Sequence, residues 1–366
     1  MILLFRANGI TASRVNKYVD YYKSHNLDFR VIGWDRLGEN IIRANYDFFN
    51  YRAKYVQGGI KAIIAKIKWI YFVYNYIKSK KDIVTTIHAC DLDVAFPSVL
   101  FKILHKKSLN IIFDVCDWNS ASKGDGFAIR CLRAMEKFTV KRCNQMILCE
   151  PERINQIQFK IPIPVHIMRN IPSFKDLSFL KERVVEPFNN GKVTVAYVGW
   201  FGHGRFIQEL LDYAEKGKVN LLIAGFGMTS IEEKCKRLNE TTDNVRFFGK
   251  VDYIYGLQIM KETDVIYAMY CKSVPNHFFA APNKFYESMF LGKPILSTSG
   301  IPLEQKIKGA GTGYTIDETV DALESFFENI TIEELQEKGK DAHKQWAYFS
   351  TLTKKFMDEE YKYMIK

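Results

Sequence analysis

The sequence predicts an α/β protein built from two doubly wound parallel sheets. Short apolar runs alternate with amphipathic stretches, which is the pattern of strands connected by helices. After a polar segment at 174–192, the same pattern starts a second time. The length of 366 residues also exceeds what one hydrophobic core usually fills, so two domains are expected.

The first half supplies the elements of one sheet. An apolar run at 2–5 predicts the first strand, and a turn containing Gly9 leads from it into a helix over 13–25. A second helix, over 91–107, is expected to cross over between two later strands. Further strands are predicted at 29–34, 82–89, 110–115 and 145–150, and the segment 164–173 ends the run.

The second half repeats the pattern. A strand is predicted over 192–199 and a helix over 205–217, followed by strands at 219–227, 244–251, 264–270 and 293–299. We therefore expect an N-terminal domain at 1–172, completed by a terminal helix at 348–366, and a C-terminal domain at 173–347. Ligands of such sheets bind at the carboxyl ends of the strands, so a cleft between the two domains is the expected site.

Composition narrows the classes of partner. A formal charge of +11 favours an anionic partner, such as a phosphate-bearing ligand or an anionic membrane. The positive charge is spread along the chain without a nucleic-acid motif, so no nucleic-acid partner is expected. Seven cysteines occur without a C-x-x-C pair, which argues against a metal site and against a disulfide framework. The start lacks the apolar core of a signal peptide, so a cytoplasmic protein is predicted.

One acidic residue, Glu287, lies in an otherwise apolar helix within 280–302. Pro282 and Asn283 are expected to begin this helix, with Asn283 as its cap, and Gly292 to end it. Glu287 then shares a face with Asn283 and Lys284. Free N–H groups at a helix start bind anions, and a carboxylate suits the vicinal diol of a ribose, so the pair predicts a nucleotide site. A solvated glutamate on a surface helix is the alternative, and it stays open.

The segment PNKFYESMFLGKPILSTSGIP (282–302) resembles the donor-binding segment of glycosyltransferase family four. The similarity extends over nearly the whole chain. VTVAYVGWFGHGRFIQELL resembles the strand and glycine loop that open the donor domain, NVRFFGKVDYIYGLQIMKETDVIYAM the base-contacting turn, and HKQWAYFSTLTKKFMDEEY the terminal helix. This resemblance implies the GT-B fold, with two Rossmann-like domains facing an interdomain cleft, and retaining transfer from a nucleotide sugar without a metal or other cofactor.

The same resemblance implies roles for several residues. Glu287 matches the second glutamate of the Glu-x7-Glu motif, which binds the ribose, whereas Phe279 stands where the first glutamate is expected. That departure leaves open how the transferred sugar is held. Backbone amides near Ala280 and Ala281, or the side chains of Asn276 and His277, are candidates for the missing contact.

Phosphate-binding groups are expected on the glycine loops. Arg205 is the first candidate, because guanidinium pairs with phosphate oxygens in a bidentate way, and Lys284 follows the same logic. Gly199 and, in the first domain, Gly9 would permit a close approach of the backbone. His203 lies in the same loop as Arg205 and is a secondary candidate for a phosphate or acceptor contact. The alternative for each is an ordinary solvated loop residue.

The acceptor side is predicted at two strand ends of the first domain. In IIFDVCDWNSAS, Asp117 is in register with the aspartate of the family's His-Asp pair, and Cys116 takes the place of the histidine. Asp117 is therefore the candidate catalytic residue, as an acceptor of a hydrogen bond from the attacking hydroxyl. His88 and Asp91, at the previous strand end, are secondary candidates. A packed or capping role is the alternative for His88.

A basic and aromatic stretch bears on location. Residues 61–81 contain six lysines and no acid among aromatic and branched apolar residues. Such a segment fits a helix lying on an anionic membrane, and equally a packed crossover helix with a basic solvent face. A peripheral position on the inner face of the cell membrane would suit a lipid-linked acceptor.

Two functions follow from these observations. The first is a hexosyltransferase that moves a sugar from a UDP- or GDP-sugar to a saccharide or lipid-linked acceptor in surface polysaccharide or glycoconjugate synthesis. The second is a non-catalytic GT-B partner subunit that binds a membrane or another transferase, and Phe279 is the feature that keeps it open.

Overall fold

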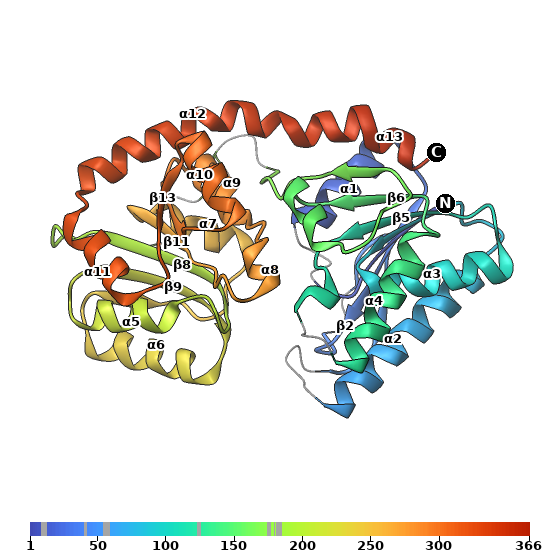
Figure 1. Ribbon diagram of the computed structural model, residues 1–366, viewed down its shortest axis with the longest axis horizontal. Coiled ribbons are helices and arrows are strands. Elements are labelled where there is room, and N and C mark those ends of the chain that lie inside the picture. Colours follow the sequence, from blue (N-terminus) through green and yellow to red (C-terminus); the bar gives the residue numbers. More distant parts are fainter. Residues whose placement is uncertain are drawn as a thin grey trace. The chain divides into compact units, whose positions relative to one another are not determined.

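The chain forms two compact units, each with its own parallel sheet (Figure 1). The first unit comprises Met1–Arg169 and Thr353–Lys366, and the second comprises Asn170–Leu352. The computed structural model describes residues 1–8, 13–39, 42–53, 59–122, 126–173, 177–178, 180 and 185–366.

The first unit contains a seven-stranded sheet in the order β3-β2-β1-β4-β5-β6-β7, and all of its pairings are parallel. Neighbouring residues of the central strand alternate between two cores, since Leu3 and Phe5 belong to one and Ile2 and Leu4 to the other. The strands are β1 (Ile2–Arg6), β2 (Phe29–Asp35), β3 (Tyr46–Asn50), β4 (Thr86–Cys90), β5 (Asn110–Val115), β6 (Gln145–Leu148) and β7 (Val165–Ile167).

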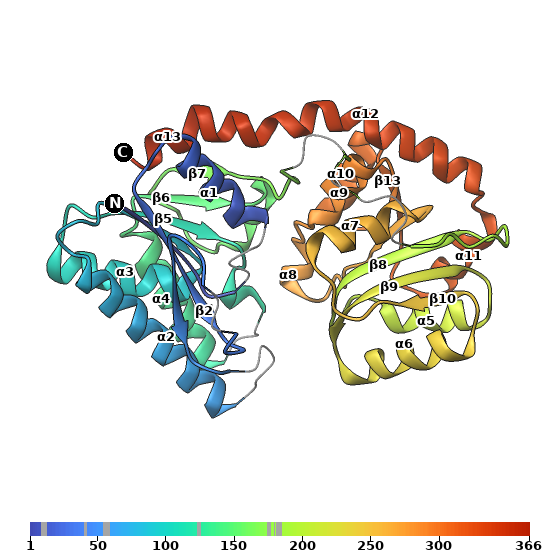
Figure 2. The ribbon, with the colours of Figure 1, turned by 180° about the vertical axis from the view of Figure 1, so that it is seen from behind.

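Helices cover both faces of this sheet (Figures 1 and 2). One face packs against α2 (Ile60–Ser79), α3 (Leu92–His105) and α4 (Phe127–Val140). The other packs against α1 (Ser13–Ser24) and the C-terminal residues of the chain. This arrangement leaves the carboxyl ends of the parallel strands as one edge, where the loops after β4 and β5 meet.

The second unit has a six-stranded parallel sheet in the order β10-β9-β8-β11-β12-β13. Its longest pairing joins β8 to β9 over eight residue pairs and places Gly199 opposite Gly225. The strands are β8 (Thr194–Phe201), β9 (Asn220–Gly227), β10 (Val245–Phe247), β11 (Val265–Ala268), β12 (Ile295–Thr298) and β13 (Gly313–Ile316).

Two groups of helices sandwich this second sheet. On one face lie α5 (Ile207–Glu215), α6 (Thr229–Thr241) and α11 (Val320–Asn329). On the other lie α7 (Tyr253–Lys261), α9 (Asn283–Leu291), α10 (Pro302–Ala310) and part of α12 (Ile332–Phe356). The short helix α8 (Pro275–Phe278) precedes α9. Among the residues placed by the structure, no helix combines the length and hydropathy needed to cross a bilayer.

The predicted fold class is confirmed, and the differences are local. The strands β3 and β13 were not predicted from the sequence. Every residue of β13 is half-buried, so it lacks the continuous apolar run that marks a buried strand. The terminal helix was predicted to start at 348, but α12 begins at Ile332 and α13 (Lys362–Met364) follows it after Met357–Tyr361.

A buried polar network ties the first unit together. Arg14 donates to both carboxylate oxygens of Asp114, with a distance of 2.9 Å from Nε to Oδ2, and Tyr18 donates to the same carboxylate at 3.0 Å. All three side chains are buried. Burial alone would raise the pKa of the Asp114 carboxyl, but the Arg14 guanidinium and His88 outweigh that effect and hold this pKa well below its usual range. The network therefore buries a paired charge.

The C-terminal segment enters the same network. The hydroxyl of Tyr361 lies 2.7 Å from Nδ1 of His88 and also hydrogen-bonds to the hydroxyl of Tyr22. Around it, Phe356 and Met364 pack into the core beneath α1. Residues more than 270 positions apart in sequence are thus joined in one buried cluster.

We predict that Arg14→Met lowers the free energy of unfolding by about 3 to 5 kcal/mol, because it leaves the Asp114 carboxylate buried without its cation. Arg30→Met is the matched control. The Arg30 guanidinium lies 3.6 Å from Asp47 in a pair whose side chains are 45% and 37% exposed, so this change should lower the free energy of unfolding by less than about 1 kcal/mol. Urea denaturation followed by circular dichroism measures both. Equal effects of the two variants would contradict the assignment.

Candidate functional site

A cavity of about 420 Å³ opens in the second unit at the carboxyl ends of β8 and β9. Its walls come from these strand ends, from the start of α7 and from the start of α9. Ligands of doubly wound sheets bind at this edge. The lining residues are Val198, Gly199, Trp200, Ala224, Gly225, Phe226, Lys250, Val251, Asp252, Tyr253, Gly256, Met260, Tyr270, Pro282, Asn283, Lys284 and Glu287.

Glu287 lines this cavity and is nevertheless only 4% exposed. Its carboxylate accepts a hydrogen bond from the hydroxyl of Tyr253, the first residue of α7. Burial raises the pKa of Glu287, whereas Lys284 and the Tyr253 hydroxyl oppose that shift. Lys284 and Tyr253 thus compensate part of the cost of burying the Glu287 carboxylate. The alternative prediction, a solvated glutamate on a surface helix, is wrong.

Two cations lie near this carboxylate. Burial lowers the pKa of Lys284 to about 8; Glu287 works against this shift, and Arg205 adds to it. The Arg205 guanidinium lies 4.4 Å from the centre of the Tyr270 ring and hydrogen-bonds to the Tyr270 side chain. Lys284 lines the cavity, whereas Arg205 lines neither this cavity nor the next one and contacts the wall residue Tyr270. The phosphate-binding role of the two cations stays a prediction.

The backbone at the mouth of the cavity is shaped by glycine. A Cβ on Gly225, whose φ is +151°, would stand 1.8 Å from the carbonyl oxygen of Gly199. A Cβ on Gly199 would stand 3.2 Å from Nζ of Lys284. Only glycine allows the two strand ends to approach this closely while the lysine lies over them.

The start of α9 also faces the cavity. The N–H groups of Asn283 and Lys284 have no partner within the helix, whereas that of Phe285 donates to the carbonyl of Pro282 at 3.2 Å. Pro282, Asn283 and Lys284 all line the cavity. Asn283 was predicted to cap this helix, but the N-cap is Pro282, and the described part of the chain provides no side-chain cap. Asn283 is instead the first helical residue. Gly292 ends the helix in the left-handed conformation with φ +66°, as predicted.

A second cavity of about 350 Å³ lies next to the first, and Tyr270 lines both. It contains His203, which is exposed, together with the loop after β8. The helix predicted from Arg205 begins two residues later, at Ile207, because Phe206 adopts a left-handed conformation with φ +54°. Arg205 consequently belongs to the loop and not to the helix.

The region around Phe279 differs in part from the expectation. The Phe279 ring packs edge-on against Phe278, with ring centres 4.9 Å apart, so an apolar group occupies the place of the motif glutamate. The backbone N–H of Ala280 donates to the carbonyl of His277 at 2.9 Å and is not available for a ligand. Asn276 lies in α8 and does not line either cavity.

The candidate residues of the first unit, Asp117, Asp91 and His88, differ in their burial and in their contacts. Asp117 has a side chain that is 71% exposed, with Nη2 of Arg153 lying 3.4 Å from Oδ1. Asp91, at φ +69°, accepts hydrogen bonds from the backbone N–H groups of Cys116 at 3.0 Å and Asp117 at 3.3 Å. Burial and the nearby Asp93 raise the pKa of Asp91 to about 7, against the pull of Arg6. Asp91 therefore holds the loop that presents Asp117.

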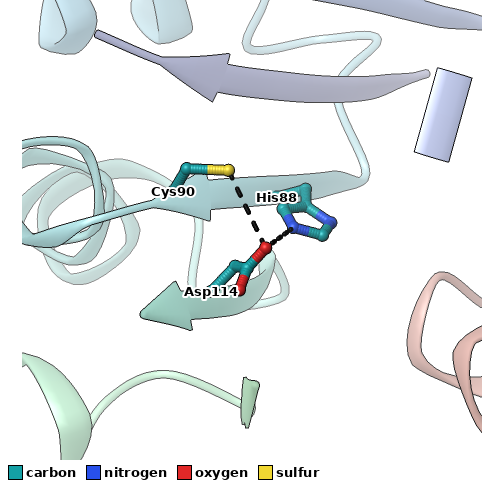
Figure 3. Close-up of side chains that lie close together, drawn as sticks. All are labelled: His88, Cys90 and Asp114. Atoms are coloured by element: carbon teal, nitrogen blue, oxygen red, sulfur yellow. Dashed lines mark hydrogen bonds and ion pairs between the residues drawn. The ribbon is translucent and has the colours of Figure 1, made fainter. Parts of the chain in front are cut away.

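His88 is fully buried and belongs to the Arg14–Asp114 network. Its Nε2 lies 3.3 Å from Oδ2 of Asp114, and Sγ of Cys90 lies 4.0 Å from the same oxygen (Figure 3). These three residue types bind metals elsewhere. Here a cation would face the Arg14 guanidinium, which already occupies both oxygens of Asp114, so we interpret the group as a structural network. This is the packed role that the sequence left open for His88. Gly9 lies outside the described residues.

Several cavity residues escaped the sequence analysis, among them Tyr253, Tyr270, Gly225 and Trp200. Tyr253 falls inside the stretch that resembles a base-contacting turn, which was a usable signal. Gly225 stands in a Gly-x-Gly at the end of a strand, a second signal for close backbone approach. Tyr270 and Trp200 carried no local signal, because aromatic residues at strand ends are usually part of a core.

The fold is shared with known structures. A sucrose-phosphate synthase from Thermosynechococcus elongatus is 12% identical, with a TM-score of 0.72 and 99% of both chains covered. An Anabaena protein, HepE, solved with UDP and glucose, is 11% identical, with a TM-score of 0.68 and 99% of both chains covered. A UDP-GlcNAc 2-epimerase from Neisseria meningitidis, bound to UDP-GlcNAc, is 14% identical, with a TM-score of 0.61 and 99% of both chains covered.

The chain has the GT-B fold. This follows from its two Rossmann-like units together with these structural neighbours. No family model matches the sequence, and no curated protein matches it significantly. At such low identities the likeness fixes the fold, and the GT-B fold carries both the synthase and the epimerase named above.

We predict that Gly225→Ala destabilises the second unit by at least about 2 kcal/mol, because the added Cβ would collide with a backbone oxygen that cannot move aside. Gly309→Ala in α10 is the control. A Cβ there meets nothing within 4 Å, so this change should raise the free energy of unfolding by up to about 1 kcal/mol. Thermal unfolding of both variants tests this, and a Gly225→Ala protein as stable as the parent would refute the close approach.

Proposed function

We propose that the cavity at the start of α9 binds the nucleotide part of a nucleotide-sugar donor. One observation carries this proposal: a buried carboxylate, Glu287, lies beside a half-buried lysine and the open start of a helix, in one cavity. A buried carboxylate is unfavourable unless a partner compensates it. A ligand with hydroxyl groups would donate hydrogen bonds to the carboxylate, and negative charge on the same ligand would pair with the lysine and the helix start.

Ribose fits the acidic part of the cavity. An ionised carboxylate has two oxygens and about four acceptor positions. The Tyr253 hydroxyl occupies one of them, which leaves room for the two hydroxyls of a vicinal diol. The aromatic residues Trp200, Phe226 and Tyr253 line the same cavity, and their rings offer surfaces on which a flat base can lie.

A diphosphate fits the basic part. The free N–H groups of α9 and its helix dipole favour an anion. Lys284 and Arg205 add charge, and Gly199 leaves space for phosphate oxygens close to the backbone. Neither a metal ion nor another cofactor is part of the proposal, because these cations can balance the charge of the leaving nucleoside diphosphate.

The reaction that fits such a donor site is glycosyl transfer. We propose a retaining glycosyltransferase of the family-four type that moves a hexose from a UDP- or GDP-sugar to a saccharide or lipid-linked acceptor, in surface polysaccharide or glycoconjugate synthesis. Departure and attack on one face of the sugar need leaving-group stabilisation and orientation more than a strong base. Asp117 suits such an orienting role, because its exposed carboxylate can accept a hydrogen bond from an incoming hydroxyl.

Phe279 supports a second candidate, a non-catalytic GT-B partner subunit. Its ring offers no acceptor for the hydroxyls of a transferred sugar. A subunit of that kind would retain the fold and bind another transferase or a membrane. The two candidates differ in one measurement: release of a free nucleoside diphosphate from a nucleotide sugar, with or without acceptor, occurs only with the enzyme.

We expect UDP or GDP to raise the unfolding temperature by several degrees at a concentration far above its Kd, since a ligand that binds only the folded state stabilises it. Glu287→Gln keeps the shape but loses the charged acceptor, so affinity should fall by about 10- to 100-fold. Glu240→Gln, on the exposed side of α6, is the control and should behave as the parent. A parent protein that no nucleotide stabilises would overturn the proposal.

Nucleotide affinity should depend on pH through Lys284. Its pKa of about 8 means that the ammonium is charged below that pH and neutral above it, so affinity for a diphosphate should fall as pH rises from 7 to 10. Bound phosphate itself raises this pKa, which moves the loss somewhat above pH 8. Lys284→Arg should keep its affinity across the range, because guanidinium stays charged. Calorimetric titrations with UDP or GDP at each pH measure this, and a flat parent profile would contradict it.

A further inference from the structure

The outer face of α2 is apolar in a way that the fold does not explain. The buried side of this helix consists of Ala65, Trp69, Val73 and Ile77, which recur every four residues and pack in the core of the first unit. The opposite side is expected to be polar. It instead carries large apolar side chains that are 43% to 75% exposed, namely Ile60, Ile63, Ile64, Ile67 and Tyr71.

These residues form one stripe, which we call the isoleucine stripe. Ile60, Ile64, Ile67 and Tyr71 recur at intervals of three or four residues, and such positions lie on one side of a helix. The helix runs along the outside of the first unit, where it is drawn in light blue (Figure 1). A row of exposed isoleucines of this length marks a surface that contacts an apolar partner.

Lysines accompany the stripe and no acid interrupts it. Lys61 and Lys68 are seven residues apart and flank it on one side, while Lys78 stands seven residues after Tyr71 and continues its direction. Lys66, which lies between Lys61 and Lys68 in the sequence, does not flank the stripe. Its Nζ lies 3.9 Å from Asp93 of α3. Nζ of Lys68 lies 4.4 Å from the centre of the Tyr51 ring, and no acidic side chain among the described residues pairs with Lys61, Lys68 or Lys78. The exposed face of α2 thus combines aliphatic side chains with positive charge that no acid neutralises there.

We propose that the isoleucine stripe docks this protein on the surface of an anionic lipid bilayer. A helix that lies in the interface inserts its apolar side chains below the headgroups and sets its lysines against anionic lipids. Charge complementarity selects this occupant: a protein partner or a second copy of α2 would have to place acidic groups opposite Lys61, Lys68 and Lys78, and α2 itself contains none.

The proposal rests on α2 alone and stands apart from the donor site in the second unit. It also agrees with the charge of the whole chain, +11, which attracts an anionic surface from a distance. If the acceptor is lipid-linked, docking through α2 would bring the first unit to it.

Vesicle sedimentation with the full chain tests the proposal. The parent should sediment with vesicles of phosphatidylglycerol and phosphatidylcholine, and salt should weaken that binding. Vesicles of phosphatidylcholine alone should bind it much less. The triple change Lys61→Glu, Lys68→Glu and Lys78→Glu should lower the partition coefficient by at least about 100-fold, since each lysine near such a surface contributes about fivefold.

Matched controls separate local from general effects. The triple change Lys218→Glu, Lys236→Glu and Lys340→Glu alters the net charge equally, at exposed positions of the second unit, and should reduce binding far less. Ile60→Gln with Ile64→Gln and Ile67→Gln should abolish the part of the binding that survives high salt, whereas Val320→Gln in α11 should not.

Three outcomes would overturn the inference: equal binding to both kinds of vesicle, equal loss in the two lysine variants, or a stable dimer that only the isoleucine variant dissolves. Thermal stabilisation by UDP or GDP is measured on the same proteins. A parent that binds nucleotide but no vesicle removes this inference and leaves the proposed function standing, while the reverse result removes the proposed function alone.

Discussion

The carboxylate of Glu287 is buried at the wall of a cavity, and the arrangement around it depends on how that burial is compensated. Tyr253 donates one hydrogen bond to this carboxylate. Lys284 adds a positive charge nearby, but burial lowers the pKa of that lysine to about 8. The first unit solves the same physical problem differently, because Arg14 pairs both oxygens of Asp114 in its core. A fully paired charge stabilises structure, whereas a partly compensated charge beside a cavity is suited to a ligand.

Close packing of the backbone and the chemistry of the cavity are linked. The Gly199–Gly225 contact lets β8 and β9 approach one another at the edge where α9 begins. The absence of side chains there brings Nζ of Lys284 close to the backbone, beside the N–H groups of the helix. A cation, a helix start and an acid thus all belong to α9, which packs on the sheet, and a helix fixes their geometry better than a loop would.

The two units have different surfaces as well as different sites. In the second unit the polar groups converge on a cavity. In the first, Asp91 accepts a hydrogen bond from the backbone N–H of Asp117, and Arg153 lies beside the exposed Asp117 carboxylate. The isoleucine stripe of α2 exposes apolar side chains to solvent. The proposed donor site and the proposed membrane surface thus belong to separate units, so each can be altered without disturbing the other.

The alternation of strands and helices, the restart near residue 192 and the helix that carries Glu287 were predictable, because each depends on local periodicity and on Pro and Gly at helix ends. Which residues become neighbours depends on contacts between distant segments and was not predictable. His88 lies in the core and hydrogen-bonds to Tyr361, which is 273 residues away in the sequence. Glu287 of α9 accepts a hydrogen bond from Tyr253 of α7. The strand β13 was invisible in the sequence, because its half-buried residues form no apolar run. Contacts between distant segments set burial, and burial sets the charge state of each group.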